Sequence, residues 1–416
     1  MRDITVIGAG QSGLILGMGL LRAGYKVRLV TNKRPGEIRS GRILSNQCMW
    51  GEALGIERGL GLALWDETAP PIPGFDTRYV PDTKIENQLK FYAPLAIPGQ
   101  SVDQRLKFST WMERFEKLGG EISVQFVKST DLAAFAKDCD LLVMAAGKGK
   151  GDLRSLFVRD EARSPFDKPA RIGASIHVRN RIPDDSNNPE REIWMVIPGV
   201  GEFWIVPTLT VHGPGHILCL QSVPGSPMDI WENVESPEQH RELILRLIKE
   251  WMPDEFERSK NVELVDNLSY LSGGIVSAVH NPIIELPNGR PCLSVGDAMV
   301  LNDPISQQGS NIATRSAKIL LDSILARKGE AFDRAWMVGT ANRIWHAIRW
   351  TVRMTEIYLN APQNYLSLFE RAAASGDQAK FLADTNNFPE SFVRAVDSDD
   401  RRAYPDDLIA PNSAAA

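Results

Sequence analysis

The chain opens with a hydrophobic pattern that predicts a strand, a helix and a second strand. Residues 3–8 form a largely apolar run with β-branched side chains, which is typical of a buried parallel strand. The apolar helix that follows runs to about Ala23 and stops at Gly24, and residues 26–31 form the next strand. We therefore predict a βαβ unit at the start of an α/β protein.

Further along, the pattern changes from alternating to helical. Residues 192–211 and 215–223 alternate or run apolar between turn residues, and we predict paired strands of a second sheet. Apolar positions at helical spacing predict an amphipathic helix over 237–252 and one long helix over 334–359. The pattern thus predicts two sheet regions followed by a helical end.

Composition narrows the class of protein. The chain has 416 residues, 43% hydrophobic and 24% charged, which predicts two to three structural units of ordinary globular character. Its net charge of -5 gives no reason to expect nucleic acid or an anionic membrane as partner. The longest apolar stretch, "GLILGMGLL", is too short to span a bilayer, and the first strand leaves no room for a signal peptide. We expect a cytoplasmic protein.

Cysteine and histidine give no metal signal. Four cysteines are scattered without a CxxC pair, which predicts small buried side chains rather than disulfides or zinc ligands. His212 and His216 have ligand-like spacing, but the glycines and proline of "HGPGH" predict a turn. We therefore predict no metal site.

The first candidate site is the glycine-rich loop after the first strand. Gly8 allows a tight turn, Gly10 lets the backbone approach a pyrophosphate, and Gly13 lets the helix pack on the strand. Gln11 and Ser12 open the helix, whose N-terminal amides favour phosphate. The loop predicts a dinucleotide site but leaves FAD, NAD and NADP open.

The end of the second strand departs from the usual pattern. An acidic residue commonly holds the adenosine ribose there. Here Thr31 and Asn32 are followed by Lys33 and Arg34, a basic pair that on its own favours the 2′-phosphate of NADP.

A second motif favours FAD. Residues 291–325 predict a strand, Gly296-Asp297, a loop with Asp303-Pro304, and a helix from about Gln308. This order resembles the ribityl-binding motif of flavoprotein monooxygenases related to para-hydroxybenzoate hydroxylase. The resemblance implies that Asp297 binds the ribityl chain and that the loop follows the flavin ring. It also implies that the helix N-terminus faces the flavin. The flavin-positioning residues would be Pro304, Gln308, Gly309, Ser310 and Asn311.

Other segments fit the same family pattern. In "SVDQRL", Arg105 stands where the family has an FAD-contacting arginine at a helix start. "DLLVMAAGKGK" resembles the family strand that ends in a glycine beside the flavin, here Gly147. Arg42, Asn32 and Lys33 are further candidates for the FAD ribose and phosphates.

A closer resemblance extends over essentially the whole chain. "PGVGEFWIVPTL", "FYAPLAIPGQSVDQRL" and the late "NNFPE" are similar to the oxygenase component of two-component styrene and indole monooxygenases. In that family an NADH-dependent flavin reductase supplies reduced FAD. The oxygenase then uses O2 to transfer one oxygen atom to a carbon–carbon double bond of a small aromatic substrate. No catalytic acid or base is assigned, and a homodimer is left open.

The resemblance also implies the fold class and the domains. We expect an α/β Rossmann-like FAD-binding domain of the para-hydroxybenzoate hydroxylase type, a β-sheet substrate domain and a C-terminal helical segment. The FAD-binding domain would comprise residues 1–55, 95–165 and 283–330, and the substrate domain 56–94 and 166–282. Residues 331–416 would form the helical segment.

The resemblance places the substrate pocket after Arg42. Ser45, Gln47 and Met49 match the indole-type members rather than the styrene-type ones, and Ile72 fits the same type. Gln47 or Ser45 would orient a polar ring N–H against an apolar wall. The complete predicted set is Ser45, Asn46, Gln47, Met49, Ile72, Phe75 and Ile205. Indole 2,3-epoxidation leading to indoxyl and indigo is therefore the expected reaction, with styrene epoxidation and sulfoxidation as side activities.

Four alternatives stay open. One is styrene monooxygenase proper, and another is a single-component aromatic hydroxylase that consumes NAD(P)H without a reductase. A flavin-dependent halogenase would carry a WxWxIP motif and an essential lysine, but "IWMVIP" lacks both tryptophans in register. The last is a non-catalytic flavin- or NAD-binding regulator.

Overall fold

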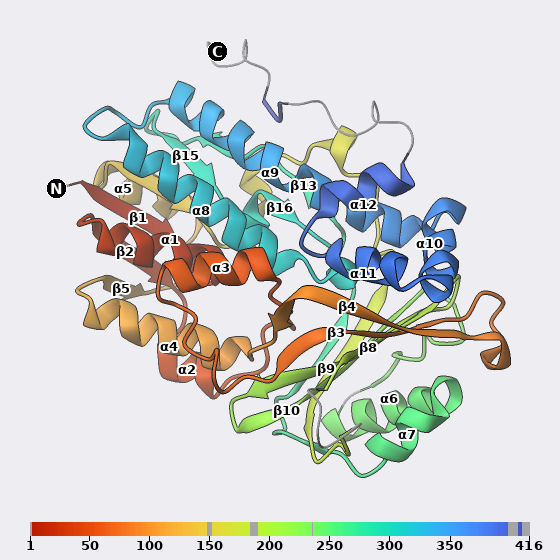
Figure 1. Cartoon of the computed structure of the whole chain (residues 1–416). Helices are drawn as coiled ribbons and strands as arrows, with labels where there is room; N and C mark the ends of the chain where they lie inside the picture. Colours follow the sequence, from red (N-terminus) through yellow and green to blue (C-terminus); the bar gives the residue numbers. More distant parts are fainter. Residues whose placement is uncertain (1, 148–151, 184–189, 235, 398–406, 410–416) are drawn as a thin grey trace.

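The computed structural model describes residues 2–147, 152–183, 190–234, 236–397 and 407–409. The strands form two large sheets, and a group of C-terminal helices lies beside both of them (Figure 1). A two-stranded ribbon of β13 (Ala278–Val279) and β16 (Val300–Leu301) completes the strands. The expected α/β class with a C-terminal helical segment is confirmed.

The first sheet has six strands in the order β14-β15-β6-β1-β2-β5. Its pairs are parallel except β14 with β15. Parallel strands buried on both faces need apolar side chains throughout, as the sequence pattern indicated. The strands are β1 (Asp3–Ile7), β2 (Lys26–Thr31), β5 (Glu121–Val124), β6 (Leu141–Met144), β14 (Ile283–Glu285) and β15 (Pro291–Ser294).

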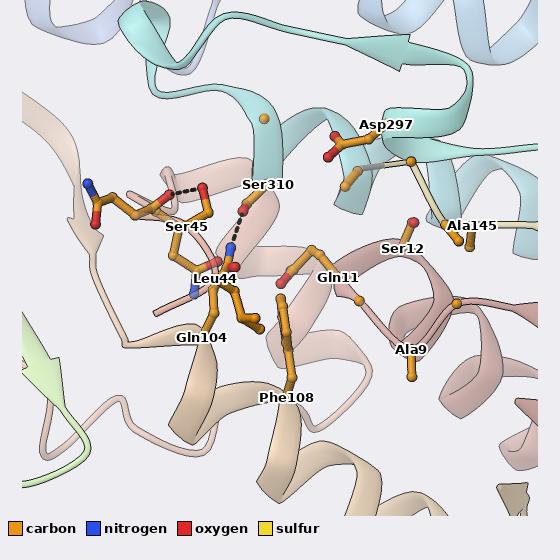
Figure 2. A pocket seen from close by; sticks show the side chains of 18 of the residues that line it. Ala9, Gln11, Ser12, Leu44, Ser45, Gln104, Phe108, Ala145, Asp297 and Ser310 are labelled. Atoms are coloured by element: carbon orange, nitrogen blue, oxygen red, sulfur yellow. Dashed lines mark hydrogen bonds between the residues drawn. The ribbon is translucent and has the colours of Figure 1, made fainter. Parts of the chain in front are cut away.

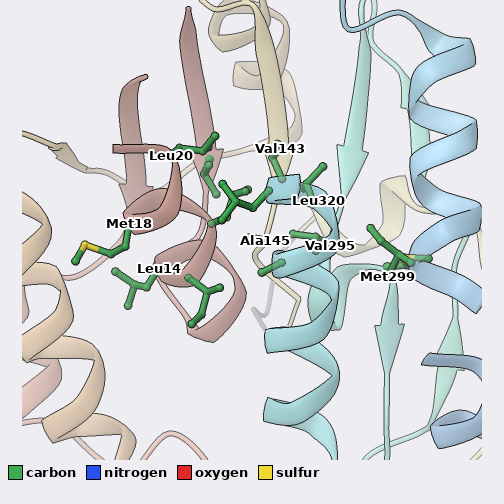
Figure 3. Close-up of a cluster of buried hydrophobic side chains, with 14 of the residues drawn as sticks. Leu14, Met18, Leu20, Val143, Ala145, Val295, Met299 and Leu320 are labelled. Carbon is green, nitrogen blue, oxygen red and sulfur yellow. The ribbon is translucent and has the colours of Figure 1, made fainter. Parts of the chain in front are cut away.

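Helices cover this sheet and close its core. Figure 3 shows part of that core, where side chains of the first helix, such as Leu14, lie with Val143 of β6 and Leu320 of the eighth helix. The helices around the first sheet include α1 (Gln11–Arg22), α2 (Pro35–Arg39), α3 (Gly51–Gly59), α4 (Gln104–Lys117), α5 (Leu132–Lys137) and α8 (Gly309–Arg327).

The second sheet has eight strands, in the order β11-β7-β10-β9-β8-β3-β4 with β12 also paired to β7. All its pairs are antiparallel except β3 with β8. The strands are β3 (Pro71–Tyr79), β4 (Leu89–Gln100), β7 (Ile172–Arg179), β8 (Glu192–Ile197), β9 (Gly201–Thr210), β10 (Gly213–Ser222), β11 (Glu263–Leu264) and β12 (Tyr270–Gly273).

Both faces of the second sheet are covered, but by different helices (Figure 1). One face packs on α6 (Pro237–Trp251) and α7 (Pro253–Ser259). The other packs on the C-terminal helices, which are α9 (Arg334–Asn360), α10 (Gln363–Ala374), α11 (Gly376–Asp384) and α12 (Pro389–Val396). Along β9 the side chains therefore alternate between two apolar cores, with Trp204 and Val206 on one and Ile205 on the other.

The chain passes between the two sheets more than once. Strands of the first sheet all fall within residues 1–55, 95–165 and 283–330. β4 belongs to the second sheet but continues to Gln100, past the boundary expected at residue 95. Antiparallel pairing with β3 carries it there, since Pro71 still pairs with Gln100.

Candidate active site

One cavity of about 660 Å³ extends from the first sheet to the second. Its first half is lined by the loops at the carboxyl ends of β1, β2, β5 and β6, where ligands of α/β sheets commonly bind. Its second half is lined by side chains of β9 and β10 and by the loop before α3. Figure 2 shows Gln11, Phe108 and Ser310, from three different helices, around the same space.

The glycine-rich loop has the shape of a phosphate cradle. Gly8 has φ 119°, and a Cβ there would lie 2.7 Å from the carbonyl carbon of Ala145, so this turn requires glycine. Gly10 lines the cavity and a Cβ on it would meet no atom within 4 Å, so a ligand can approach the backbone. Gly10 is also the N-cap of α1 and has no capping side chain. The N-terminus of α1 therefore remains open to an anion.

A buried polar group supports this loop from behind. Gln11 lines the cavity, and its Nε2 donates to Oε1 of Glu57 at 2.7 Å and to Oγ1 of Thr314 at 2.8 Å. Lys107 pairs with the same carboxylate at 2.6 Å, and both charged side chains are 1% exposed. Gly13 does not line the cavity. A Cβ on it would lie 2.0 Å from the Gly8 oxygen, so the close packing of the helix on this loop requires glycine. It serves helix packing, as its place in the motif indicates.

The far end of the first half is neutral to basic and carries an exposed aromatic ring. Asn32 and Lys33 line the cavity there, with Thr31. Phe126, after β5, lines the same end and is 62% exposed. Gln125 lies beside it on the wall. Sequence reasoning missed Phe126 because nothing local distinguishes it from other exposed hydrophobic residues.

The loops predicted to hold a flavin meet at the middle of the cavity. Gly147, Asp297, Pro304, Gly309 and Ser310 all line it. A Cβ on Gly147 would lie 2.2 Å from Cβ of Asp297, so the two loops touch. Figure 2 places Asp297 and Ser310 on the same side of the cavity.

Two neighbours of these loops have structural roles. Gly296 has φ 65° and lies directly against Ser12, itself on the cavity wall. Asp303 accepts a hydrogen bond from the Ile305 amide at 2.9 Å, and burial raises the pKa of its carboxyl to about 7. It therefore caps the turn over Pro304–Ser306.

Gln308 and Asn311 are fully buried and do not line the cavity. Gln308 Nε2 donates to the Asn386 carbonyl at 2.8 Å. Asn311 accepts from the Trp50 amide at 2.9 Å and donates to the Cys48 carbonyl at 2.9 Å. Only one face of a helix start can meet a ligand, so these two residues fix the neighbouring loops instead.

The two arginines expected at the FAD ribose and phosphates also lie outside the cavity wall. Arg105 is 1% exposed and donates to Asp103 and Asp266, each at 2.8 Å. Arg42 donates to the Tyr270 carbonyl at 3.0 Å and covers the Tyr270 ring. Their guanidinium groups are occupied by protein partners, which sequence position alone does not reveal.

In the second half of the cavity, Ser45, Asn46 and Gln47 line the wall, as does Cys48. Ser45 Oγ donates to the Asn46 carbonyl at 3.1 Å (Figure 2). Gln47 Nε2 donates to the Val102 carbonyl at 2.9 Å, whereas its Oε1 has no partner among the described residues.

Four predicted pocket residues lie behind this wall. Met49 is 1% exposed and pairs through its backbone with Gln100. Ile72 is fully buried, and Phe75 packs against Trp50 and Trp194. Ile205 faces the core on the α6 side of the sheet, so Trp204 and Val206 line the cavity in its place. The prediction of Ile205 was one residue out of register. Consecutive side chains of a strand point to opposite faces of the sheet, so its neighbours face the cavity instead.

Several lining residues were not predicted at all. They come from elements far apart in the sequence, so only the fold brings them together. They are Gln104, Phe108, Trp204, Val206, Ile217, Cys219, Gln221, Ile275, Asn302 and Gln307.

A buried carboxyl group joins two of the lining loops. Glu192 is fully buried at the start of β8, accepts from Gln307 Nε2 at 2.5 Å and lies 3.7 Å from Cys48 Sγ. Burial raises its pKa to about 8. Among the residues that the structure describes, no Lys, Arg or His forms an ion pair with it.

The rest of the described chain gives two further findings. No group of three or more His, Cys, Asp or Glu residues suited to a metal ion occurs within it. None of its helices is long and apolar enough to cross a membrane.

Comparison with known proteins places these observations in a family context. Residues 149–258 match the family described as the styrene monooxygenase A substrate binding domain. Styrene monooxygenase StyA of Pseudomonas fluorescens is 27% identical, with 100% of both chains covered.

Among solved structures, a triple mutant of the flavin-dependent brominase Bmp2 superposes with a TM-score of 0.69 at 17% identity, covering 96% of this chain and 100% of the other. A flavoprotein/dehydrogenase from Cytophaga hutchinsonii has a TM-score of 0.64 at 16% identity, covering 99% and 98%. At these identities the two structures show the shared fold. Together with the full-length similarity to a styrene monooxygenase, the matches identify this chain as a flavin-dependent monooxygenase with FAD as its cofactor, related to the styrene monooxygenase oxygenases.

Proposed function

We propose that the protein is the oxygenase of a two-component system that epoxidises a double bond conjugated to an aromatic ring. Reduced FAD would come from a separate NADH-dependent flavin reductase, and O2 would supply the oxygen atom. The observation that carries this proposal is the continuous cavity that joins a dinucleotide loop at one end to an apolar sheet face at the other. When bound there, reduced FAD would supply the two electrons that activate oxygen.

The residues present fit FAD. Gly10 and the start of α1 would hold the pyrophosphate, and Asp297 would hold the ribityl chain. Gly309 lines the middle of the cavity and a Cβ on it would meet nothing within 4 Å, so the flavin ring can approach this backbone. The protein's task is then to exclude water and to hold the substrate near the flavin.

Indole is the substrate we propose over styrene. Ser45 and Gln47 line the second half of the cavity, beside Trp204, Val206 and Ile217. Gln47 is anchored through its Nε2, so its carbonyl oxygen is the atom left to accept a hydrogen bond from a ring N–H. Styrene would still enter, because an apolar pocket discriminates only weakly between such shapes.

The reaction can be tested with the pure protein. Reduced FAD is supplied without oxygen, and oxygen and indole are then admitted; blue pigment and consumption of indole are expected. Gln47→Leu should lower kcat/KM for indole by about 10-fold and leave that for styrene within about twofold. Oxidation of NADPH by the protein alone, without a reductase, would contradict the two-component assignment. Equal losses for both substrates would contradict the role of Gln47.

Phe126 offers a separate test of the cofactor end. Its exposed ring lies beside Asn32 and Lys33, where the adenine of FAD would lie if the pyrophosphate meets α1. Stacking of a base on an aromatic side chain contributes about 1–3 kcal/mol. Phe126→Ala should therefore weaken FAD binding by roughly 5- to 160-fold, while FMN, which lacks adenine, should bind as before. Calorimetric titration with both flavins measures this, and equal weakening for both would contradict the placement.

A further inference from the structure

A line of polar side chains connects a buried charged cluster to the cavity wall. Asp103, the N-cap residue of α4, has its Oδ2 3.4 Å from Nδ1 of His177 on β7. Nε2 of the same imidazole lies 3.1 Å from Oδ1 of Asn46, which lines the cavity. Asp103 and His177 are each 1% exposed, so the protein rather than water determines how they are oriented.

The charged cluster fixes the inner end of this line. Although burial alone would raise the pKa of Asp103, His177 and Arg105 hold it well below its usual range. Arg105 donates to Asp103 through Nε and Nη2, at 3.1 and 2.8 Å, and through Nη1 to Asp266. Asp103 is therefore ionised. His177 Nδ1 faces it at 3.4 Å without a hydrogen bond, and the Nε2–H of the imidazole is the group that donates to Asn46 Oδ1.

The contact between His177 and Asn46 determines which polar group of Asn46 is left to face the cavity. Its carbonyl oxygen is occupied by His177, so the amide nitrogen is the group left to donate. Cys219 also lines the cavity, and burial raises the pKa of its thiol to about 12. The neighbouring wall is apolar, with Trp204, Val206 and Ile217.

We propose that Asn46 donates a hydrogen bond to the oxygen atom that is transferred, and that His177 and Asp103 are positioning residues that hold its amide in place. This rests on the proposed epoxidation. In that reaction bound reduced FAD would supply two electrons and two protons. One atom of O2 forms two C–O bonds where the π bond was, and the other leaves as water. The alkene group has no hydrogen-bond acceptor atom, whereas the transferred oxygen can accept a hydrogen bond.

The alkene cannot accept a hydrogen bond from Asn46, but the transferred oxygen can. The donor will therefore stabilise the transition state more than the bound alkene. Removing it should lower kcat and leave KM nearly unchanged. It should also weaken binding of an epoxide relative to the corresponding alkene. Neither change is expected if Asn46 only supports the loop between Ile43 and Trp50.

The test uses Asn46→Asp, which keeps the shape of the side chain and removes its N–H donors. With styrene as substrate, we expect kcat to fall about 10- to 100-fold and KM to stay within about twofold. With oxidised FAD bound, titration should show styrene oxide binding about 10-fold more weakly to the variant, and styrene binding unchanged. Melting temperature reports whether the variant is folded.

The positioning residues are tested through His177. His177→Phe should lower kcat in the same direction, and His177→Gln should recover part of it because its amide can donate to Asn46. His240→Phe is the matched control, since His240 is equally buried but bonds a carbonyl on α6. Wild-type kcat and epoxide affinity in Asn46→Asp, or a rise in KM without a fall in kcat, would overturn the inference. Absence of epoxidation by the wild type would instead contradict the proposed function.

Discussion

Replacing Lys107 with methionine should destabilise the protein by about 3–5 kcal/mol, because it leaves the Glu57 carboxylate buried without a cation. The pair is joined at 2.6 Å with 1% exposure on each side. Burial lowers the pKa of Lys107, and the charge of Glu57 opposes that effect. Each buried charge is therefore stabilised by the other. Thermal unfolding should show a melting temperature lower by about 4–6 °C.

Two companion variants separate the buried charge from lost packing. Glu57→Gln combined with Lys107→Met removes both charges and should regain most of the stability, since a neutral pair carries no unpaired ion. Lys318→Met breaks an exposed pair with Asp322, at 2.6 Å, and should change stability by less than about 1 kcal/mol. Equal losses in Lys107→Met and in the double variant would contradict the argument.

The same pair affects the cofactor loop. Gln11 donates to the Glu57 carboxylate from the first turn of α1, beside the open amides of the glycine-rich loop. In Lys107→Met the Glu57 carboxylate loses its cation and will rearrange, and Gln11 loses a fixed partner. We expect weaker FAD binding in this variant. Partial recovery is expected in the double variant, because the amide oxygen introduced by Glu57→Gln can still accept from Gln11.

The sequence predicted the parts of the site that depend on local backbone geometry. The glycine-rich loop needs a tight turn between a strand and a helix, and these requirements leave a readable spacing at Gly8, Gly10 and Gly13. The Gly296-Asp297 motif is similar, because a residue with positive φ must precede the side chain that lines the cavity. Local steric requirements of this kind are encoded within a few neighbouring residues.

The sequence could not predict which long side chains are already engaged. Arg105 occupies the position expected of an FAD-contacting arginine, but Asp103 and Asp266 bind its guanidinium group. Asp266 lies far along the chain, so only tertiary structure brings it near. The line of polar side chains from Asp103 through His177 to Asn46 was missed for the same reason. β7, α4 and the Asn46 loop meet only in the folded protein.

Strand register was the other source of error. The second sheet is buried on both faces, so every position of β9 is buried, apolar side chains occur on both of its faces, and hydrophobicity does not mark the cavity face. Ile205 was therefore as plausible from the sequence as Trp204. The face is decided by pairing with β8 and β10, where Trp204 lies opposite Trp194 and Cys219.

The stability of the protein should fall as pH rises from about 5 to about 8, and Glu192→Gln should remove much of that fall. Burial raises the pKa of Glu192 from 4.5 to about 8. Between these values the unfolded chain releases the proton and the folded chain retains it. The unfolded state then binds fewer protons, so stability decreases with pH, and above pH 8 the loss is complete. The upper limit of this loss of folding stability is about 5 kcal/mol.

Glu192→Gln carries no titrating group at this position, and its amide oxygen can still accept from Gln307. Relative to the wild type, it should gain stability steadily between pH 5 and pH 8 and then level off, which melting temperatures at a series of pH values would measure. Asp303→Asn is the matched comparison: burial raises the pKa of Asp303 to about 7, so its gain should level off about one pH unit earlier. Parallel wild-type and Glu192→Gln curves would show that Glu192 is ionised throughout. In that case the carboxylate, not the carboxylic acid, holds Gln307 at the cavity wall.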